Sequence, residues 1–363
     1  MALVAGALSL GVSGEAFGER KTPRLLWGEG TPRYLKIPGG DLHEALRQSA
    51  AGANVPLWSG SFTFQGTTFP YTMVGTDPSA GSATSSVPVV IIPVKFSFAD
   101  GTTLSATDPV CDGTDSAVTL TQNSPVFQDV AFAPGGTYVG TTQYVDAFQR
   151  ANFWNAVSTA SPDYHVRLGP MTVAATQAVR ISRLVGATLT GPCAKIGTVN
   201  ITAFDIWAKQ TIKALNVPAT SLPLFLSYNT FWTQGGCCIL GYHSATSNSQ
   251  TYSVAAFSDP GVFNVPIQDI HALSHEIGEW MDDPLINNAT PGWLAGQASV
   301  CQKNLEVGDP VTGIAFTVAL NNFTYHPEDL VFLSWFARES PSSAVNGWYT
   351  FLNTFATPPA VCH

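Results

Sequence analysis

The chain has 363 residues, of which 45% are hydrophobic and 11% are charged, so it can bury a sizeable core and global disorder is excluded. Its formal net charge of −9 argues against nucleic acid or an anionic membrane as a partner. No segment is long and apolar enough for a transmembrane helix, so we expect no membrane span; composition leaves the oligomeric state open.

The N-terminus has the features of a signal peptide. Ala2–Val12 is a run of small apolar residues that is too short to span a bilayer, and Ala16-Phe17-Gly18 fits a small-x-small cleavage site. The basic segment that usually precedes such a run is missing. We therefore predict a signal peptide over residues 1–18 and a secreted, extracellular protein.

The next stretch, residues 19–54, mixes charged residues with Gly and Pro and shows little periodicity. We predict an N-terminal arm or pro-segment here, with a short helix near Leu42–Gln48. Residues 55–363 are expected to form a single α+β domain of catalytic character, because alternating segments typical of strands are mixed with a few helical ones.

Within this domain the expected elements follow from local periodicity. Pro88 and Pro93 predict that the strand containing them lies at an edge or bends. The helix expected over 267–281 should stop before Pro284, because the residue that precedes a proline is disfavoured in helical geometry. We expect strands at 55–74 (a hairpin), 87–98, 164–184, 222–232 and 251–257, helices at 141–157, 204–215 and 267–281, and strands and loops over 314–355.

The six cysteines are an even number, and together with the signal-like start they favour disulfides. No Cys-x-x-Cys pair is present, so a structural zinc site made of thiolates is not expected. We predict the disulfides Cys111–Cys193 and Cys301–Cys362. The adjacent cysteines Cys237 and Cys238 then either bond to each other or have a special role.

The most informative motif lies in the helix expected over 267–281. His275-Glu276-Ile277-Gly278-Glu279 reads His-Glu-x-x-Glu, one residue away from the His-Glu-x-x-His motif of zinc peptidases. Positions i and i+4 share a helix face, so His275 and Glu279 can hold one metal ion while Glu276 accepts a proton from water. Imidazole nitrogen and carboxylate oxygen are both accepted zinc ligands.

His271 allows a second interpretation, because His271, His275 and Glu279 form one stripe at i, i+4 and i+8. In that alternative His271 and His275 are the ligands, and Glu279 is the base or supports a ligand. We favour His275 and Glu279, which keep the order ligand, base, x, x, ligand. A buried polar face without a metal is the third interpretation.

Glu306 lies 27 positions after Glu279 and is the candidate for a third ligand. A catalytic zinc needs three protein ligands and one open position. In one large class of zinc peptidases the third ligand is a Glu, followed a few residues later by an Asp that hydrogen-bonds a ligating His. We therefore predict Glu306 as a ligand and Asp309 as the residue that orients His275. A solvated acidic loop is the alternative, because glycine and proline flank Asp309.

A wider resemblance extends the motif. The chain resembles a group of secreted bacterial, zincin-like metallopeptidases with a Ser-His-Glu-x-x-Glu-x-x-x-Asp-Pro signature, in Ser274–Glu279, Asp282-Asp283-Pro284, Trp293 and Glu306–Asp309. Cys238–His243 resembles a Cys-Gly-x-His stretch of the plant phosphate-induced, Exordium-like proteins, which are distantly similar. The resemblance covers roughly the last 140 residues well. It implies a zincin-like fold with a mixed or antiparallel sheet, a metal-site helix and a C-terminal region rich in strands and loops.

These features favour a secreted zinc-dependent metallopeptidase that hydrolyses protein or peptide substrates. Zinc lowers the pKa of water toward ~7, and Glu276 would accept the proton and pass it to the leaving amine. The oxyanion needs a donor besides the metal, and His243 or Tyr242 is the candidate; an ordinary loop histidine is the alternative. A serine hydrolase is disfavoured, because no Gly-x-Ser-x-Gly segment is present.

The alternative function is a non-catalytic extracellular protein that binds glycan or other cell-wall material and holds a structural ion. Its oxygen donors would be Glu279, Glu306, Asp309 and Asp283, a set that suits Ca²⁺. Aromatic side chains could stack on sugars, although such residues more often belong to the core: Trp27, Trp58, Trp293, Trp335 and Trp348. The identity of the metal separates the two functions.

Overall fold

The computed structural model of the chain describes residues 32–111 and 113–363. The predicted signal peptide over residues 1–18, the first part of the predicted arm and Trp27 lie outside the described residues. Within these two ranges, no helix has the length and apolar character needed to cross a bilayer.

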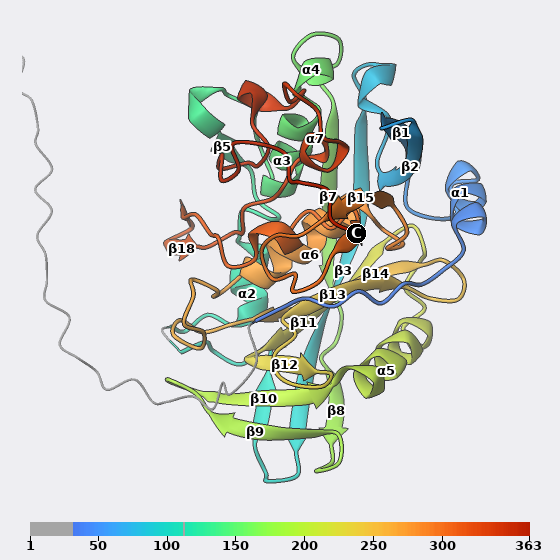
Figure 1. Ribbon diagram of the computed structural model, residues 1–363. Coiled ribbons are helices and arrows are strands. Elements are labelled where there is room, and N and C mark those ends of the chain that lie inside the picture. Colours follow the sequence, from blue (N-terminus) through green and yellow to red (C-terminus); the bar gives the residue numbers. More distant parts are fainter. Residues whose placement is uncertain (1–31, 112) are drawn as a thin grey trace, which may run out of the picture.

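The described chain is a mixed α+β fold built around one long sheet (Figure 1). Its helices are α1 (Leu42–Ala50), α2 (Ala117–Gln122), α3 (Tyr144–Asn152), α4 (Trp154–Val157), α5 (Ile201–Ala214), α6 (His271–Asp282) and α7 (Leu333–Ala337). Its strands are β1 (Leu57–Phe64), β2 (Thr67–Val74), β3 (Thr84–Phe98), β4 (Thr103–Ser105), β5 (Val130–Phe132), β6 (Gly140–Thr142), β7 (His165–Val173), β8 (Gln177–Ile181), β9 (Gly186–Thr190), β10 (Lys195–Asn200), β11 (Leu222–Tyr228), β12 (Thr230–Thr233), β13 (Gly241–Ala245), β14 (Thr251–Phe257), β15 (Ala289–Trp293), β16 (Gln302–Asn304), β17 (Val318–Leu320) and β18 (Phe323–Tyr325).

The central sheet has seven strands in the order β13-β14-β11-β3-β4, and β7 and β8 also pair with β3. The pairs β3–β11, β3–β7, β3–β8 and β11–β14 are parallel, whereas β13–β14 and β3–β4 are antiparallel. The predicted mixed sheet is therefore confirmed, and it is mainly parallel. β13 pairs on one side only, which leaves it at the edge of this sheet, beside α6.

Of the two alternatives predicted from the prolines, the edge position is wrong, since β3 is central and pairs on both sides, whereas an irregularity does occur at Pro88. Its partner on one side changes from β7 to β8 between Ile91 and Val94, and Pro93 falls in this gap. Pro88 falls at the register shift between Val87 and Val89. A missing backbone N–H is tolerated at both places because no ladder hydrogen bond is required there.

Two hydrophobic clusters cover the two faces of the central sheet. Alternation along β11 sends Leu222, Leu224 and Leu226 into one cluster and Phe225 into the other, as the two-residue period of a strand requires. The first cluster includes side chains of α3 and α6, and the second includes side chains of α5. Helices thus cover both faces, and α6 lies in the first layer (Figure 1).

The motif helix begins later than predicted, at His271 and not at residue 267. Asp269 has a positive φ of 42°, and its side chain accepts the backbone N–H of Ile270 at 2.6 Å, so the chain enters the helix through a tight turn. α6 ends at Asp282, before Pro284, as expected. All residues of α6 are buried, so its polar stripe faces protein on every side.

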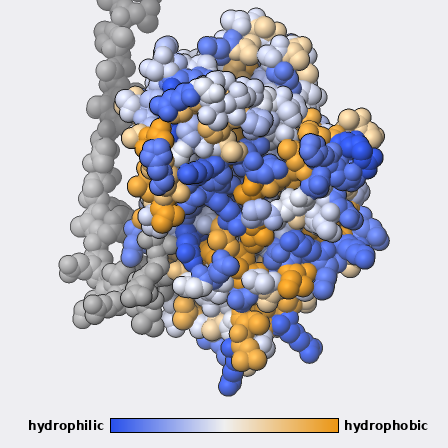
Figure 2. Space-filling view, turned by 45° about the vertical axis from the view of Figure 1, so that its right-hand side comes forward, coloured by the Kyte–Doolittle hydropathy of each residue, from blue (hydrophilic) through white to orange (hydrophobic). Residues whose placement is uncertain are grey.

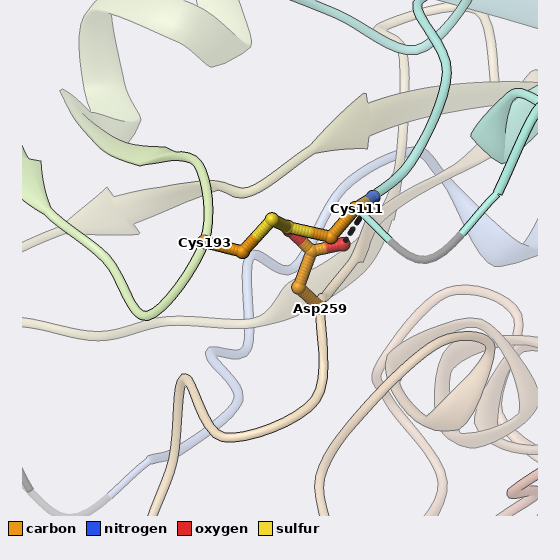
Figure 3. Close-up of side chains that lie close together, drawn as sticks. All are labelled: Cys111, Cys193 and Asp259. Carbon is orange, nitrogen blue, oxygen red and sulfur yellow. Dashed lines mark hydrogen bonds between the residues drawn. A yellow bond between two sulfur atoms is a disulfide. The ribbon is translucent and has the colours of Figure 1, made fainter.

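The predicted disulfides Cys111–Cys193 and Cys301–Cys362 are present, and Cys237 bonds to Cys238. Cys111 and Cys193 join two distant segments next to Asp259, whose Oδ1 accepts the backbone N–H of Cys111 at 3.4 Å (Figure 3). Three disulfides are compatible with an extracellular protein. On the face shown in Figure 2, small hydrophobic patches are set among polar residues, which is ordinary for an exposed surface.

Other expected elements are confirmed with different bounds. The 55–74 hairpin is β1 and β2, paired in antiparallel register. The helix predicted over 141–157 is two helices, α3 and α4, separated at Phe153. The C-terminal region contains the predicted strands and also α7, which was not predicted. Trp293 and Trp335 are buried in the first cluster, so they cannot stack on an external sugar as the alternative function would require.

Candidate metal centre

The helical spacing of the motif brings His275 and Glu279 together. Nε2 of His275 lies 3.0 Å from Oε1 of Glu279. Nε2 nevertheless has no hydrogen-bond partner among the described residues, so this close pair does not form a hydrogen bond. Two ligands of a tetrahedral zinc, with bonds of about 2.0–2.1 Å, lie roughly 3.3 Å apart. The pair therefore has the separation of two ligands that face a common point.

Ligand atoms gather in two overlapping trios around Glu279. His275, Glu276 and Glu279 form one trio, and His243, Glu279 and Glu306 form the other; within each, the donor atoms lie within 4.8 Å of one another. Glu279 belongs to both, and His275 and Glu306 belong to one each. The predicted set of His275, Glu279 and Glu306 thus spans the two trios and stays a prediction.

His243 reaches the cluster from the edge strand β13. Its Nε2 lies 3.0 Å from the backbone oxygen of Asp283, which can only accept, so Nε2 carries the proton. Its Nδ1 lies 3.2 Å from Oε2 of Glu276 and 3.9 Å from Oε2 of Glu279. Burial lowers the pKa of His243 to about 3, so the ring is neutral. It presents a lone pair to the cluster, which favours a ligand role over the predicted donation to an oxyanion.

Gly241, at the start of β13, allows Glu276 to approach the strand. A side-chain carbon at residue 241 would lie 2.7 Å from Cγ and 2.8 Å from Oε1 of Glu276. Tyr242, the other predicted oxyanion donor, is buried in the second hydrophobic cluster. Since neighbouring strand residues point to opposite faces, Tyr242 and His243 cannot both face the cluster. The candidate Tyr242 is therefore wrong.

The segment after β16 supplies the remaining acids. Glu306 is buried, and its Oε1 accepts a hydrogen bond of 2.8 Å from Asn304 Nδ2. The backbone N–H groups of Gly308 and Asp309 both lie 3.2 Å from Oε1 of Glu279 and hold that carboxylate in place. The predicted acidic segment is therefore folded onto α6, and it is not a solvated loop.

Glu328, not Asp309, orients His275. Oε2 of Glu328 lies 2.9 Å from Nδ1 of His275, whereas Oδ1 of Asp309 lies 3.8 Å from Nε2, the ring nitrogen that faces Glu279. A carboxylate on the second ring nitrogen fixes the tautomer and raises the basicity of a ligating imidazole. The predicted role of Asp309 is therefore wrong, and Glu328 is the residue beside His275 that the sequence did not predict.

His271, the alternative ligand, lies on the Glu328 side of His275. Its Nε2 is 3.1 Å from Oε2 of Glu328, and it belongs to neither trio around Glu279. Glu328 Oε2 thus lies between two imidazoles, one turn of α6 apart. This arrangement favours His275 with Glu279 as the ligand pair.

Burial dominates the electrostatics of the cluster. It raises the pKa values of Glu276, Glu279 and Glu306 well above the usual range, and the neighbouring carboxylates raise them further. Burial also raises the pKa of Glu328 to about 7. Lys36 is a cation at the margin of the cluster, 3.2 Å from Oδ2 of Asp309. These shifts favour the protonated acids, whereas the positive charge of a metal ion would favour the ionised carboxylates.

Asp283, proposed as an oxygen ligand for Ca²⁺, is engaged elsewhere. Its carboxylate accepts the backbone N–H groups of Asn287 at 2.8 Å and Asn288 at 3.1 Å. Only Glu279, Glu306 and Asp309 of that predicted set remain near the trios. The buried His, Glu and Asp groups can hold a metal ion. The imidazole nitrogens among them are typical ligands of Zn²⁺, whereas Ca²⁺ takes oxygen ligands.

Comparison with known proteins adds no assignment, since no protein-family model, no curated protein and no solved structure matches this chain.

Proposed function

We propose that the protein is a secreted, zincin-like, zinc-dependent metallopeptidase that hydrolyses peptide bonds. The single observation that carries this proposal is the pair His275 and Glu279, whose donor atoms lie 3.0 Å apart without a hydrogen bond between them. Glu306 is the third proposed ligand, and His243 is a further donor that reaches the same carboxylate group.

Zinc at this position would polarise the scissile carbonyl and make water acidic enough to react near neutral pH. Glu276 lies next to the pair, and its Oε1 is buried without a hydrogen-bond partner among the described residues. It takes the proton of the attacking water while the new carbon–oxygen bond forms, and it returns the proton to the amine as the carbon–nitrogen bond breaks. Glu328 holds His275 in place through Nδ1 throughout.

A non-catalytic protein with a structural ion is the second candidate, and one observation favours it. His275 and Glu276 are fully buried, and Glu279 and Glu306 are 3% and 1% exposed, so a substrate cannot reach the cluster in this conformation. A structural metal site is closed, whereas a catalytic site keeps one position open.

Elemental analysis of purified protein, combined with a protein-degradation assay with and without chelator, tests the two functions. The peptidase predicts about one zinc per chain and an activity that the chelator abolishes and added zinc restores. Calcium with no activity would support the structural ion. A protein that binds no metal under metal-replete conditions would refute both.

A further inference from the structure

The described part of the N-terminal arm lies directly over the candidate metal centre. Residues 33–39 run in extended conformation beside β13, and the chain then turns at Gly40 and enters α1 (Figure 1). The Tyr34 ring stacks on the His275 imidazole, with 3.3 Å between ring centroids and 12° between planes, and its hydroxyl lies 3.4 Å from Oε2 of Glu328. Tyr34 is 7% exposed and therefore covers the ring that we propose as a metal ligand.

The arm begins with one isolated parallel bridge between Arg33 and Ile239. The Arg33 N–H donates to the Cys238 oxygen at 3.0 Å, and the Leu240 N–H donates to the Arg33 oxygen at 2.9 Å. Ile239, between them, exchanges both of its backbone groups with Trp232 of β12. Arg33 therefore pairs with the backbone of residues 238–240 on the side that β12 leaves open, and an open edge of this kind accepts an extended peptide through main-chain hydrogen bonds.

Two side chains of the arm have specific binding pockets. Residues two apart on an extended chain point to the same side, which places Tyr34 and Lys36 on the side of the metal centre. Lys36 Nζ lies 2.8 Å from Gln302 Oε1, 2.7 Å from Asn304 Oδ1 and 3.2 Å from Asp309 Oδ2. An aromatic pocket and a polar, acidic pocket thus lie side by side along one extended segment.

No disulfide fixes the described residues of the arm to this site. A hollow of about 200 Å³ remains between it and the segment around Gln297 and Gln302, so the arm is not close-packed along its whole length. Pro38 and Gly40 are exposed, and Gly40 has a positive φ of 80°. Exposed residues of this kind are accessible to a protease. The backbone on either side is held in place, because Ser244 Oγ donates to the Ile37 oxygen at 2.6 Å and the Asp41 N–H donates to Ser249 Oγ at 2.9 Å.

We propose that residues 33–37 occupy a binding site for extended peptides and block the metal centre from within the chain. The ligand class is a peptide with an aromatic residue followed, two positions later, by a basic residue. The inference rests on the proposed function only in treating such a peptide as substrate. Loss of the arm, by cleavage near Gly40 or by displacement, opens the centre.

The test compares parent protein with the double variant Tyr34→Ala, Lys36→Ala in the full chain. The probe is a fluorescent peptide of residues 33–38, Arg-Tyr-Leu-Lys-Ile-Pro, with a scrambled peptide as control. The tethered arm competes with the probe at an effective concentration of roughly millimolar. Only the open fraction of the protein can bind the probe, so the apparent affinity falls in proportion to that fraction. The double variant should bind the probe at least tenfold more tightly than the parent does. Tyr138→Ala removes a tyrosine that is 58% exposed and should behave as the parent.

A folded double variant that ignores the probe, or binds the scrambled peptide equally well, would overturn the inference. If the double variant does not fold, a site-specific protease sequence inserted between Gly40 and Asp41 allows the parent to be cut after folding. Cutting should then raise the affinity for the probe at least tenfold, and equal binding before and after cutting would overturn the inference. Zinc content plays no part in this readout, so a metal-free protein would refute the proposed function and leave the peptide site standing.

Discussion

Two regions that bury carboxylates, one on α3 and one on α6, differ in the number of hydrogen-bond donors around the carboxylate. Asp146 of α3 is fully buried and receives three donors: Thr142 Oγ1 at 2.7 Å, His165 Nδ1 at 2.6 Å and the Val166 backbone N–H at 2.6 Å. Glu276 of α6 is equally buried. Its Oε2 meets one imidazole nitrogen at 3.2 Å, and its Oε1 meets no donor among the described residues.

The difference separates an acid whose hydrogen bonds are satisfied from one that keeps an unpaired oxygen. Buried polar groups in folded proteins are nearly always hydrogen-bonded, because an unmade bond costs about 1–3 kcal/mol. Asp146 follows this rule and joins α3 to β7. The cluster on α6 breaks it at Glu276 Oε1 and at His275 Nε2, and it does so where further carboxylates are close. Unpaired atoms so close to several carboxylates are compatible with a bound cation, which these His and Glu side chains could hold.

The largest expected effects separate ligand from base within the α6 cluster. Glu279→Ala should reduce bound zinc from about one per chain to almost none, because Glu279 belongs to both trios. Glu276→Gln should keep the zinc, since the amide preserves the shape, and should lower peptidase activity at least a hundredfold, because it cannot accept a proton. Metal content by mass spectrometry and initial rates on a protein substrate measure the two effects.

His271→Ala is the control for this assignment and should keep the zinc. If His271→Ala loses the ion and Glu279→Ala keeps it, the ligands are His271 and His275. If Glu279→Ala loses the metal but the parent shows no activity, the structural-ion function is favoured.

A second prediction sets the two regions against each other in stability. Asp146→Ala leaves the donors of Thr142, His165 and Val166 without their acceptor, and should lower the free energy of unfolding by roughly 3 kcal/mol. In metal-free protein, Glu276→Gln removes a carboxylate from an acidic cluster and should leave stability unchanged or higher. Urea unfolding in the presence of chelator measures both. A similar loss in both variants would remove the distinction between the regions.

The contrast also shows how far the sequence could lead. Helical spacing alone placed His275, Glu276 and Glu279 on one buried face, because i and i+4 are neighbours on any α-helix. The disulfide partners were also predicted, and the main strands followed from their alternation. These features depend on local geometry or on a small number of possible pairings.

Contacts between residues far apart in the sequence could not be predicted from local spacing. Glu328 is 53 residues from His275, and no spacing rule connects the two. A signal existed nonetheless: Glu328 and Asp329 are adjacent acids in a C-terminal stretch with very few others. The central position of β3 was missed for a related reason, because only the change of partner from β7 to β8 explains why its prolines are tolerated.

A third prediction concerns this missed residue. Glu328→Gln keeps the size of the side chain, but it replaces a carboxylate with an amide against Nδ1 of His275. The imidazole becomes less basic and less well oriented, and zinc affinity should fall about tenfold or more, which corresponds to about 1.4 kcal/mol. Competition with a chromophoric chelator measures the affinity. An unchanged affinity would show that the zinc does not use His275.

The smallest expected effect comes from the backbone that lies against the same imidazole. A side-chain carbon at Gly308 would lie 2.2 Å from Nδ1 of His275, although the φ of −90° at this residue suits any amino acid. Gly308→Ala therefore adds a steric contact without backbone strain. The ring is already held by the stacked Tyr34 and by Glu328, so it can only tilt. Overpacking typically costs 1–3 kcal/mol, and part of this cost falls equally on the metal-free protein. Zinc affinity should then fall about fivefold with the fold intact, whereas Gly113→Ala, where the nearest atom is 3.7 Å away, should change nothing. Equal affinity in both variants would mean that the ring position does not control the metal, and the acids of the cluster would have to hold it without His275.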